Sequence, residues 1–147
     1  MRMQPVLQHD EVLAAIEAIR RELARRGKSA VVAVADAHGE LIALVRLDGA
    51  PASSVRIATN KAYTAARLRR PTRVLGATLK SRGTDVAFYG DPRYTGFGGG
   101  LPVAVGGAVV GAIAVSGLSD TEDDALAAIG IVAIPGADPP PPADPGA

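Results

Sequence analysis

Lys61 stands in an alanine-rich stretch of the chain, a setting in which a lysine can take part in acid–base or carbonyl chemistry. It falls within a helix expected over residues 53–69, beside a stripe of small residues made up of Ala58, Ala62, Ala65 and Ala66. A partly buried lysine has a lowered pKa and can act as a base or as a carbonyl-binding amine. Two structural interpretations stay open: the side chain reaches past the alanines to water, or it pairs with Asp36 or Asp48.

Three further polar residues join Lys61 as candidates for the wall of a small-molecule pocket. Arg46 comes at the end of an expected strand, and Asp85 and Tyr94 lie in a glycine-rich loop. Functional side chains concentrate on such loops. We therefore expect these four candidate catalytic residues to line a pocket for a small organic anion, formed where the loop of one subunit meets a helix of another.

Gly98, Gly99 and Gly100 follow the loop directly. Because glycine has no side chain, the backbone N–H groups of such a run can approach a ligand or an oxyanion closely. A tight entry into the following strand is an equally open interpretation. A nucleotide-binding loop is excluded, because the next residues are typical of a strand and no Gly-Lys-Ser/Thr follows.

Patterned segments in the first half of the chain are expected to position these residues. Apolar residues recur at helical spacing over residues 10–26, which predicts an amphipathic helix. Apolar runs predict two antiparallel strands, over residues 30–35 and 41–46. The helix that carries Lys61 ends before Pro71, because the residue before a proline is pushed out of the helical region. Thr72 is then expected to cap a short helix.

The second half of the chain predicts a loop, a hairpin and a helix. Closely spaced glycines in residues 81–100 predict a loop with one edge strand. Gly106-Gly107 suits the tight turn of a hairpin, with strands over residues 101–105 and 108–115. The last helix is expected to begin at Ser119 or Asp120 and to end near residue 134. Capping and the helix dipole explain the acidic residues at its start. The alternative is weak cation binding by the acidic run of Asp120, Glu122, Asp123 and Asp124.

These elements predict an α/β domain of the α+β type, with helices packed on an antiparallel sheet of about five strands. The domain is expected to span residues 5–134. Residues 135–147 contain six prolines and almost nothing to bury, which predicts a disordered or polyproline-like tail. Removing residues 136–147 should therefore leave folding and ligand binding intact.

Length and composition limit the classes of protein that remain. A chain of 147 residues suits one domain. All 16 Lys and Arg residues and 9 acids lie in residues 1–97, while residues 98–147 carry 6 acids and no Lys or Arg. No aromatic residues interleave with the basic ones, so nucleic-acid binding is not expected. Without cysteine, disulfides and thiolate chemistry are excluded. No leader and no long apolar run are apparent, so we expect a cytoplasmic protein that does not enter a membrane.

Three ordered motifs resemble the GlcG/HbpS family, also known as haem-degrading or PduO C-terminal-like domains (DUF336). The first is the hairpin segment of residues 36–50, and the second runs from residue 51 to the Arg70-Pro71-Thr72 stop. The third is the glycine-rich run of residues 98–117. The resemblance covers most of the chain, and it implies a profilin-like fold and a homo-oligomer, often of eight subunits.

The same resemblance implies haem or a related tetrapyrrole as a ligand. An axial ligand has to be His, Met, Tyr or Cys, and the histidines are His9 and His38. His38 is the expected ligand, because the tip of a hairpin can lie over a neighbouring subunit's pocket, and Gly98, Gly99 and Gly100 are expected to contact the cofactor. His38 and Glu40 do not make a closed metal site by themselves, so no separate metal is expected.

The sequence therefore predicts a small-molecule-binding oligomer. The alternative is a cofactor-independent enzyme that acts on a small carbonyl or carboxylate compound in a pocket between subunits. A structural or accessory protein without a ligand of its own is the third class.

Overall fold

The structure is a computed structural model that describes residues 1–143. Within this range the helices are α1 (His9–Arg26), α2 (Ser54–Leu68), α3 (Thr72–Arg82) and α4 (Asp120–Val132), with a short 3-10 helix η1 (Val86–Tyr89). The strands are β1 (Val31–Asp36), β2 (Leu41–Arg46), β3 (Gly100–Val105) and β4 (Ala108–Ser116). The expected α+β class is confirmed.

The strands form an antiparallel sheet in the order β2-β1-β4-β3, four strands within the described residues. The expectation of about five strands was wrong, because residues 81–99 do not form the edge strand expected there. That segment turns instead, because the Asp85 carboxylate accepts a hydrogen bond from Ala87 N at 2.8 Å and starts η1. Gly90 then ends η1 with a φ of 73°.

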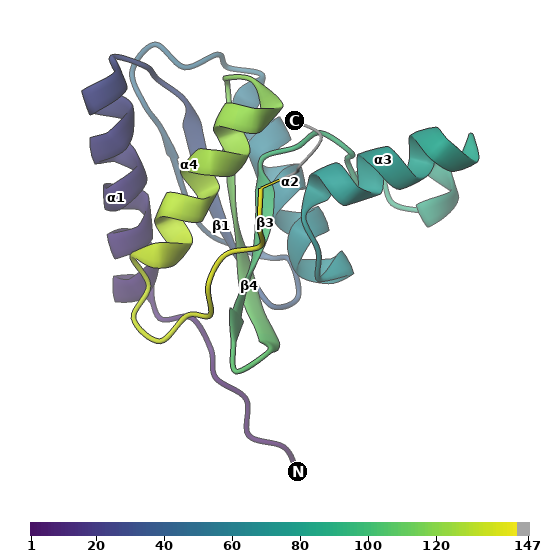
Figure 1. The fold of residues 1–147 in the computed structure, drawn as a ribbon, viewed down its shortest axis with the longest axis horizontal. Helices are drawn as coiled ribbons and strands as arrows, with labels where there is room; N and C mark the ends of the chain where they lie inside the picture. The colour runs from purple at the N-terminus through teal and green to yellow at the C-terminus, as the bar shows by residue number, and fades with distance from the viewer. Residues whose placement is uncertain (144–147) are drawn as a thin grey trace.

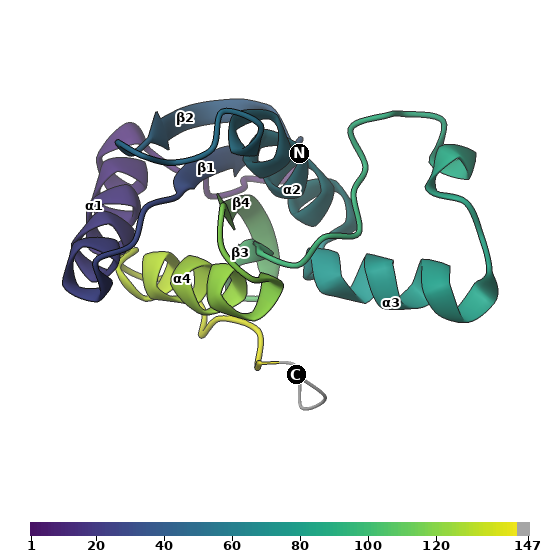
Figure 2. The same ribbon diagram turned by 90° about the horizontal axis from the view of Figure 1, so that it is seen from above.

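Helices cover the sheet on both faces (Figures 1 and 2). Helices α1 and α4 pack on one face, and α2 packs on the other. Helix α3 and the segment after it extend away from the sheet, on the side opposite α1 (Figures 1 and 2). Over the described residues, no helix combines the length and the apolar character needed to cross a membrane.

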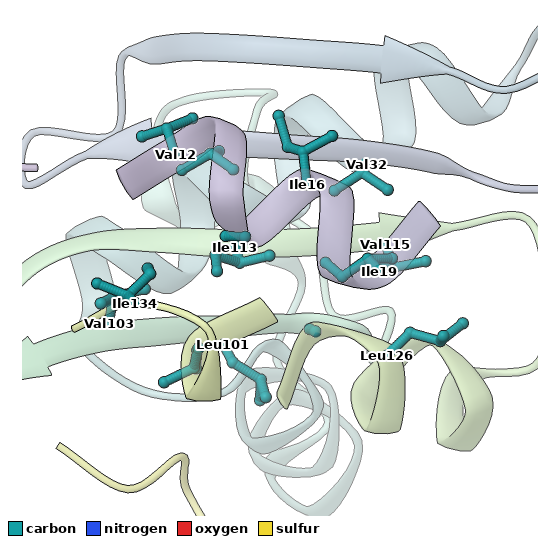
Figure 3. Packing of buried hydrophobic residues seen from close by; sticks show 14 of the residues in the cluster. Val12, Ile16, Ile19, Val32, Leu101, Val103, Ile113, Val115, Leu126 and Ile134 are labelled. Atoms are coloured by element: carbon teal, nitrogen blue, oxygen red, sulfur yellow. The ribbon is translucent and has the colours of Figure 1, made fainter. Parts of the chain in front are cut away.

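Residue size differs between the two faces of the sheet. Under α1 and α4 the core is aliphatic, with Ile19, Ile113 and Leu126 among its buried members (Figure 3). Under α2 it is built mainly from alanines. Short side chains let α2 approach the sheet closely: a Cβ at Gly100 would lie 2.7 Å from the main-chain O of Lys61. The alanine stripe thus places Lys61 directly at the entry to β3.

The structure confirms the helix ends and the hairpin turn that neighbouring residues predict. Gly27 ends α1 with a φ of 63°. Gly106 and Gly107 have φ of 58° and 80°, as the tight hairpin turn requires. Ser119 caps α4 in a capping box with Glu122. Thr72 differs from its expected capping role, because its buried hydroxyl bonds to the main chain of Gly100 instead.

Part of the expected tail contacts the domain. The Asp138 carboxylate accepts hydrogen bonds from Gly106 N at 2.9 Å and Gly107 N at 2.7 Å. Asp138 N donates to Ala104 O on the edge strand β3, and Arg73 donates to Pro142 O at 2.6 Å. Polar contacts thus hold parts of residues 135–143 on the domain, in place of the apolar contacts that the tail lacks. Residues 144–147 lie outside the described residues.

Candidate functional site

Lys61 is buried and paired with a carboxylate of α4. Its Nζ donates to Asp123 Oδ2 at 3.0 Å and to Val115 O at 2.9 Å. Only 3% of the Lys61 side chain and 1% of the Asp123 side chain are exposed. The partner is therefore Asp123, and the alternative pairing with Asp36 or Asp48 was wrong. A pair this buried joins α2, β4 and α4 at one point.

The environment of Asp123 acts on its protonation in two opposing ways. Burial raises the pKa of the Asp123 carboxyl above its ordinary value. The charge of Lys61 and the hydrogen bonds from Lys61 and from Leu118 N act against burial. Among residues 1–143 this ion pair is the one in which both side chains are almost fully buried, so it is the most strongly desolvated charge in the domain.

A cavity of about 270 Å³ opens beside the ion pair. Lys61 and Asp123 line it, together with Asp120 at the start of α4. Its other walls come from the residues before and within the first turn of α2, from the loop before β3 and from the turn after β4: Pro51, Ser53, Ser54, Ile57, Phe97, Ser116, Gly117 and Leu118. Serine hydroxyls and apolar side chains therefore face the same space as the charged pair.

The glycine run lies against this site, but its N–H groups bond within the chain. Gly98 N donates to Asp120, Gly99 N to Asp124 and Gly100 N to Thr72, at 2.9, 2.8 and 3.0 Å. None of these three N–H groups is left to bind an oxyanion, so the structure does not support the expected N–H cradle.

Gly99 has a steric reason to be glycine. Its φ is 116°, and a Cβ there would lie 2.6 Å from Val115 O, 2.7 Å from the Asp123 Cβ and 2.8 Å from the Lys61 Nζ. The segment therefore passes directly over the ion pair, and no side chain fits between them.

The acidic start of α4 does more than cap the helix. Asp120 and Asp124 anchor the glycine run, and Asp123 pairs with Lys61. Arg73 of α3 donates to Asp124 at 2.6 Å. The run of carboxylates thus fastens α2, α3 and the loop before β3 to one end of α4.

His38 lies in a different part of the molecule, at the exposed tip of the β1–β2 hairpin. The Asp36 carboxylate accepts hydrogen bonds from His38 N at 2.8 Å and Glu40 N at 3.0 Å. Arg67 of α2 donates to His38 O at 3.3 Å. The turn is therefore held from both sides while the imidazole stays exposed.

An aromatic cluster supports the hairpin tip. The ring of buried Tyr63 lies 5.3 Å from that of Tyr94, which lies 5.0 Å from that of Tyr89. The Arg93 guanidinium carbon lies 4.0 Å from the Tyr63 ring centre, a cation–π contact. Tyr63 OH donates to Asp91 at 2.6 Å. Burial, and next this hydrogen bond, raises the pKa of Tyr63 to about 12.

The remaining candidates do not join Lys61. Tyr94 belongs to the aromatic cluster, where its OH accepts from Arg67. Asp85 starts η1. Arg46, on the edge strand β2, donates to Ala50 O. These three residues are absent from the wall of the cavity beside Lys61, so the chain does not form the expected four-residue pocket by itself.

Sequence reasoning missed Asp123 as a site residue, as well as Ser54 and Ser116. The acidic run has a sufficient explanation as a helix cap, and Ser54 and Ser116, although they fall within the second and third matched motifs, carried no expected role in a site. A lone lysine in an alanine stripe signals that a buried carboxylate pairs with it, because a buried ammonium needs such a partner, but it does not identify which acidic residue that is. In residues 1–143, no group of three or more His, Cys, Asp or Glu side chains is placed to hold a metal ion.

Known proteins share both the sequence pattern and the fold. A family model described as "Haem degrading protein HbpS-like" matches residues 7–132. Protein GlcG of Escherichia coli K12 is 35% identical over 116 residues, which cover 79% of this chain and 85% of GlcG. A double mutant of Streptomyces reticuli HbpS has a TM-score of 0.81 at 28% identity, over 90% of this chain and 89% of that chain.

A third similar protein was solved as a PduOC:heme complex. It has a TM-score of 0.83 at 24% identity, over 92% of this chain and 99% of that chain, which supports the fold alone. The family model spans both the hairpin that carries His38 and the helices that carry Lys61 and Asp123. By this match and by its identity to GlcG, the chain belongs to the HbpS-like family.

Proposed function

We propose that this protein is a small-molecule-binding protein of the HbpS type whose ligand is haem or a related tetrapyrrole. Two findings on related proteins support the class of ligand: the family description names haem degradation, and the similar PduOC structure is a heme complex. The observation on this chain that carries the proposal is His38, an exposed imidazole on a hairpin tip that hydrogen bonds hold in place.

The donor set at the hairpin tip fits a haem. Imidazole is a common axial ligand of haem iron, and the rigid turn lowers the entropy lost when the ligand is bound. His9 fits less well, because its Nε2 lies 3.3 Å from the Asp10 carboxylate at the start of α1. His38 is thus the axial ligand in this proposal.

Neighbouring groups suit the rest of a haem. Arg67 and Arg93 lie beside the turn, with Arg93 3.5 Å from Glu40, and guanidinium groups pair well with carboxylates such as propionates. The ring of Tyr89 is partly exposed at the edge of the aromatic cluster and offers an apolar contact. When bound, haem would supply a redox-active iron; the protein's residues bind it and orient it.

The proposal includes a homo-oligomer, with eight subunits as the expected number. Phe88 in η1 is 82% exposed, and Leu41 on the edge strand β2 is 47% exposed. Exposed apolar residues and an unpaired strand edge favour association. A mass above that of a dimer in light scattering is expected, and a monomeric mass at micromolar concentration would contradict the oligomer.

Haemin titration followed by absorbance tests the ligand. Wild-type protein should shift and sharpen the Soret band at a saturable stoichiometry, and His38→Ala should abolish that change. His9→Ala is the matched control and should behave as wild type. If both variants give the wild-type spectrum, the proposed imidazole ligand is wrong.

A further inference from the structure

The cavity beside Lys61 has the features of a ligand site that is separate from the hairpin tip. It opens between the first turns of α2 and α4, where Ser54 and Asp120 begin these helices. Its volume of about 270 Å³ lies just below the range of roughly 300–1,000 Å³ that ligand pockets usually have. A volume of this size suits a small molecule.

Buried hydroxyl groups line this cavity without partners of their own. Ser54 and Ser116 are 4% and 3% exposed, and both contribute to its wall. Among the hydrogen bonds of residues 1–143, none engages either hydroxyl, although neither oxygen is sealed off from the cavity. Ser53, the N-cap of α2, makes no side-chain capping hydrogen bond. Since the polar groups of buried residues are normally satisfied, the Ser54 and Ser116 hydroxyls are placed to bond a ligand or water in the cavity.

Lys61 offers one more donor to the same space. An ammonium group has three N–H donors, and Val115 O and Asp123 accept two of them. The third is available to an acceptor in the cavity that Lys61 lines. A carbonyl oxygen is an acceptor of suitable size for it.

The charges around the cavity select against an anion. Its wall carries one ammonium, on Lys61, and two carboxylates, on Asp120 and Asp123. The ammonium is already paired, at 3.0 Å, so an added carboxylate or phosphate would meet an excess of negative charge. An uncharged molecule avoids this cost. Ile57 and Phe97 add apolar wall for its carbon atoms.

We propose that this cavity binds a small uncharged hydroxycarbonyl compound. The carbonyl oxygen accepts from Lys61, and the hydroxyl groups exchange hydrogen bonds with Ser54 and Ser116. The site does not depend on haem, since none of its residues contributes to the hairpin tip.

Ligand-observed saturation-transfer NMR with dihydroxyacetone as the probe tests the proposal. Wild-type protein should give saturation transfer to dihydroxyacetone and less to glycerate, an anion of similar size. Ser54→Ala and Ser116→Ala should each weaken binding about threefold to tenfold, as expected for one lost hydrogen bond. The matched control is Ser81→Ala, whose hydroxyl bonds to Thr78 O on α3 and which should bind as wild type does.

Other results would overturn the proposal. Absence of transfer to dihydroxyacetone in folded wild-type protein excludes the ligand class, and tighter binding of glycerate excludes the charge argument. Unchanged binding in both Ser54→Ala and Ser116→Ala excludes this cavity as the place of binding. The two serine variants keep the ion pair, so thermal melting should show that they are folded. Their haemin titrations should match wild type, which separates this site from the proposed haem site.

Discussion

Lys61 and Asp123 lie 62 residues apart in the chain, yet their Nζ and Oδ2 atoms are 3.0 Å apart in the interior. The pair joins the helix that packs on the alanine face of the sheet to the acidic first turns of α4. The glycine run before β3 crosses directly above it. This buried contact thus holds α2, α4 and the glycine run together, and both of its residues line the cavity.

Replacing one member of this pair should lower the free energy of unfolding more than replacing both members. Lys61→Met leaves a buried carboxylate without its cation, and Asp123→Leu leaves a buried ammonium, so each should lower the free energy of unfolding by about 3–5 kcal/mol. The double variant should lose clearly less than the sum of the two. Urea denaturation of the four proteins measures this coupling. Additive losses would show that the two groups do not depend on each other.

Gly99 should tolerate no side chain. Gly99→Ala would place a Cβ within 2.8 Å of Val115 O, Asp123 and Lys61, and we expect a loss of about 3 kcal/mol or more from strain and displacement of the pair. Gly83→Ala is the matched control, since Gly83 also has a positive φ but has nothing within 4 Å of its would-be Cβ. It should lose only about 1 kcal/mol. Similar melting temperatures for both variants would contradict the close approach.

Features set by neighbouring residues could be predicted from the sequence. The C-terminal end of α1 and the β3–β4 turn depend on glycines that adopt positive φ, and the start of α4 depends on a serine and a glutamate three residues apart. Each of these requires only local hydrogen bonds. The small residues beside Lys61 indicated that it could be partly buried, but they left open whether its ammonium reaches water.

Features set by packing could not be predicted. The partner of Lys61 depends on how α4 lies against β4, and nothing local distinguishes Asp123 from its acidic neighbours. The same holds for Thr72, whose hydroxyl caps no helix but holds Gly100. In residues 81–100, glycine spacing indicated a loop, but the turn that Asp85 starts there left no room for an edge strand.

Asp138 should stabilise the β3–β4 hairpin from outside the expected domain. Asp138→Ala removes the acceptor of two amide hydrogen bonds, and we expect a loss of about 1 kcal/mol in the free energy of unfolding. Deleting residues 136–147 should cost at least as much, while deleting only residues 144–147 is the control and should cost less. Equal stability of wild type and the three variants would show that the tail is dispensable, as the sequence predicts.

Acid should weaken the aromatic cluster through Asp91. The hydrogen bond from Arg93, and next that from Tyr63, holds the pKa of Asp91 well below its usual range. A lowered folded-state pKa means that the ionised form stabilises the fold. This stabilisation is complete above the unfolded-state pKa of about 4 and is lost as the pH falls through the folded-state value.

Asp91→Asn provides the test of that acid dependence. The variant should be less stable than wild type at neutral pH, and the two should converge as the pH falls below about 4. Urea midpoints across this pH range measure the difference. Curves that stay parallel down to strongly acidic pH would show that Asp91 has an ordinary pKa.

Imidazole rescue of a His38→Gly variant tests the proposed haem site most directly. Glycine leaves space at the hairpin tip, so free imidazole can take the place of the missing side chain as an axial ligand. The account predicts that His38→Gly with haemin lacks the wild-type Soret band and regains it when excess imidazole is added. His9→Gly should need no rescue. A wild-type Soret band in His38→Gly before any imidazole is added would contradict the account.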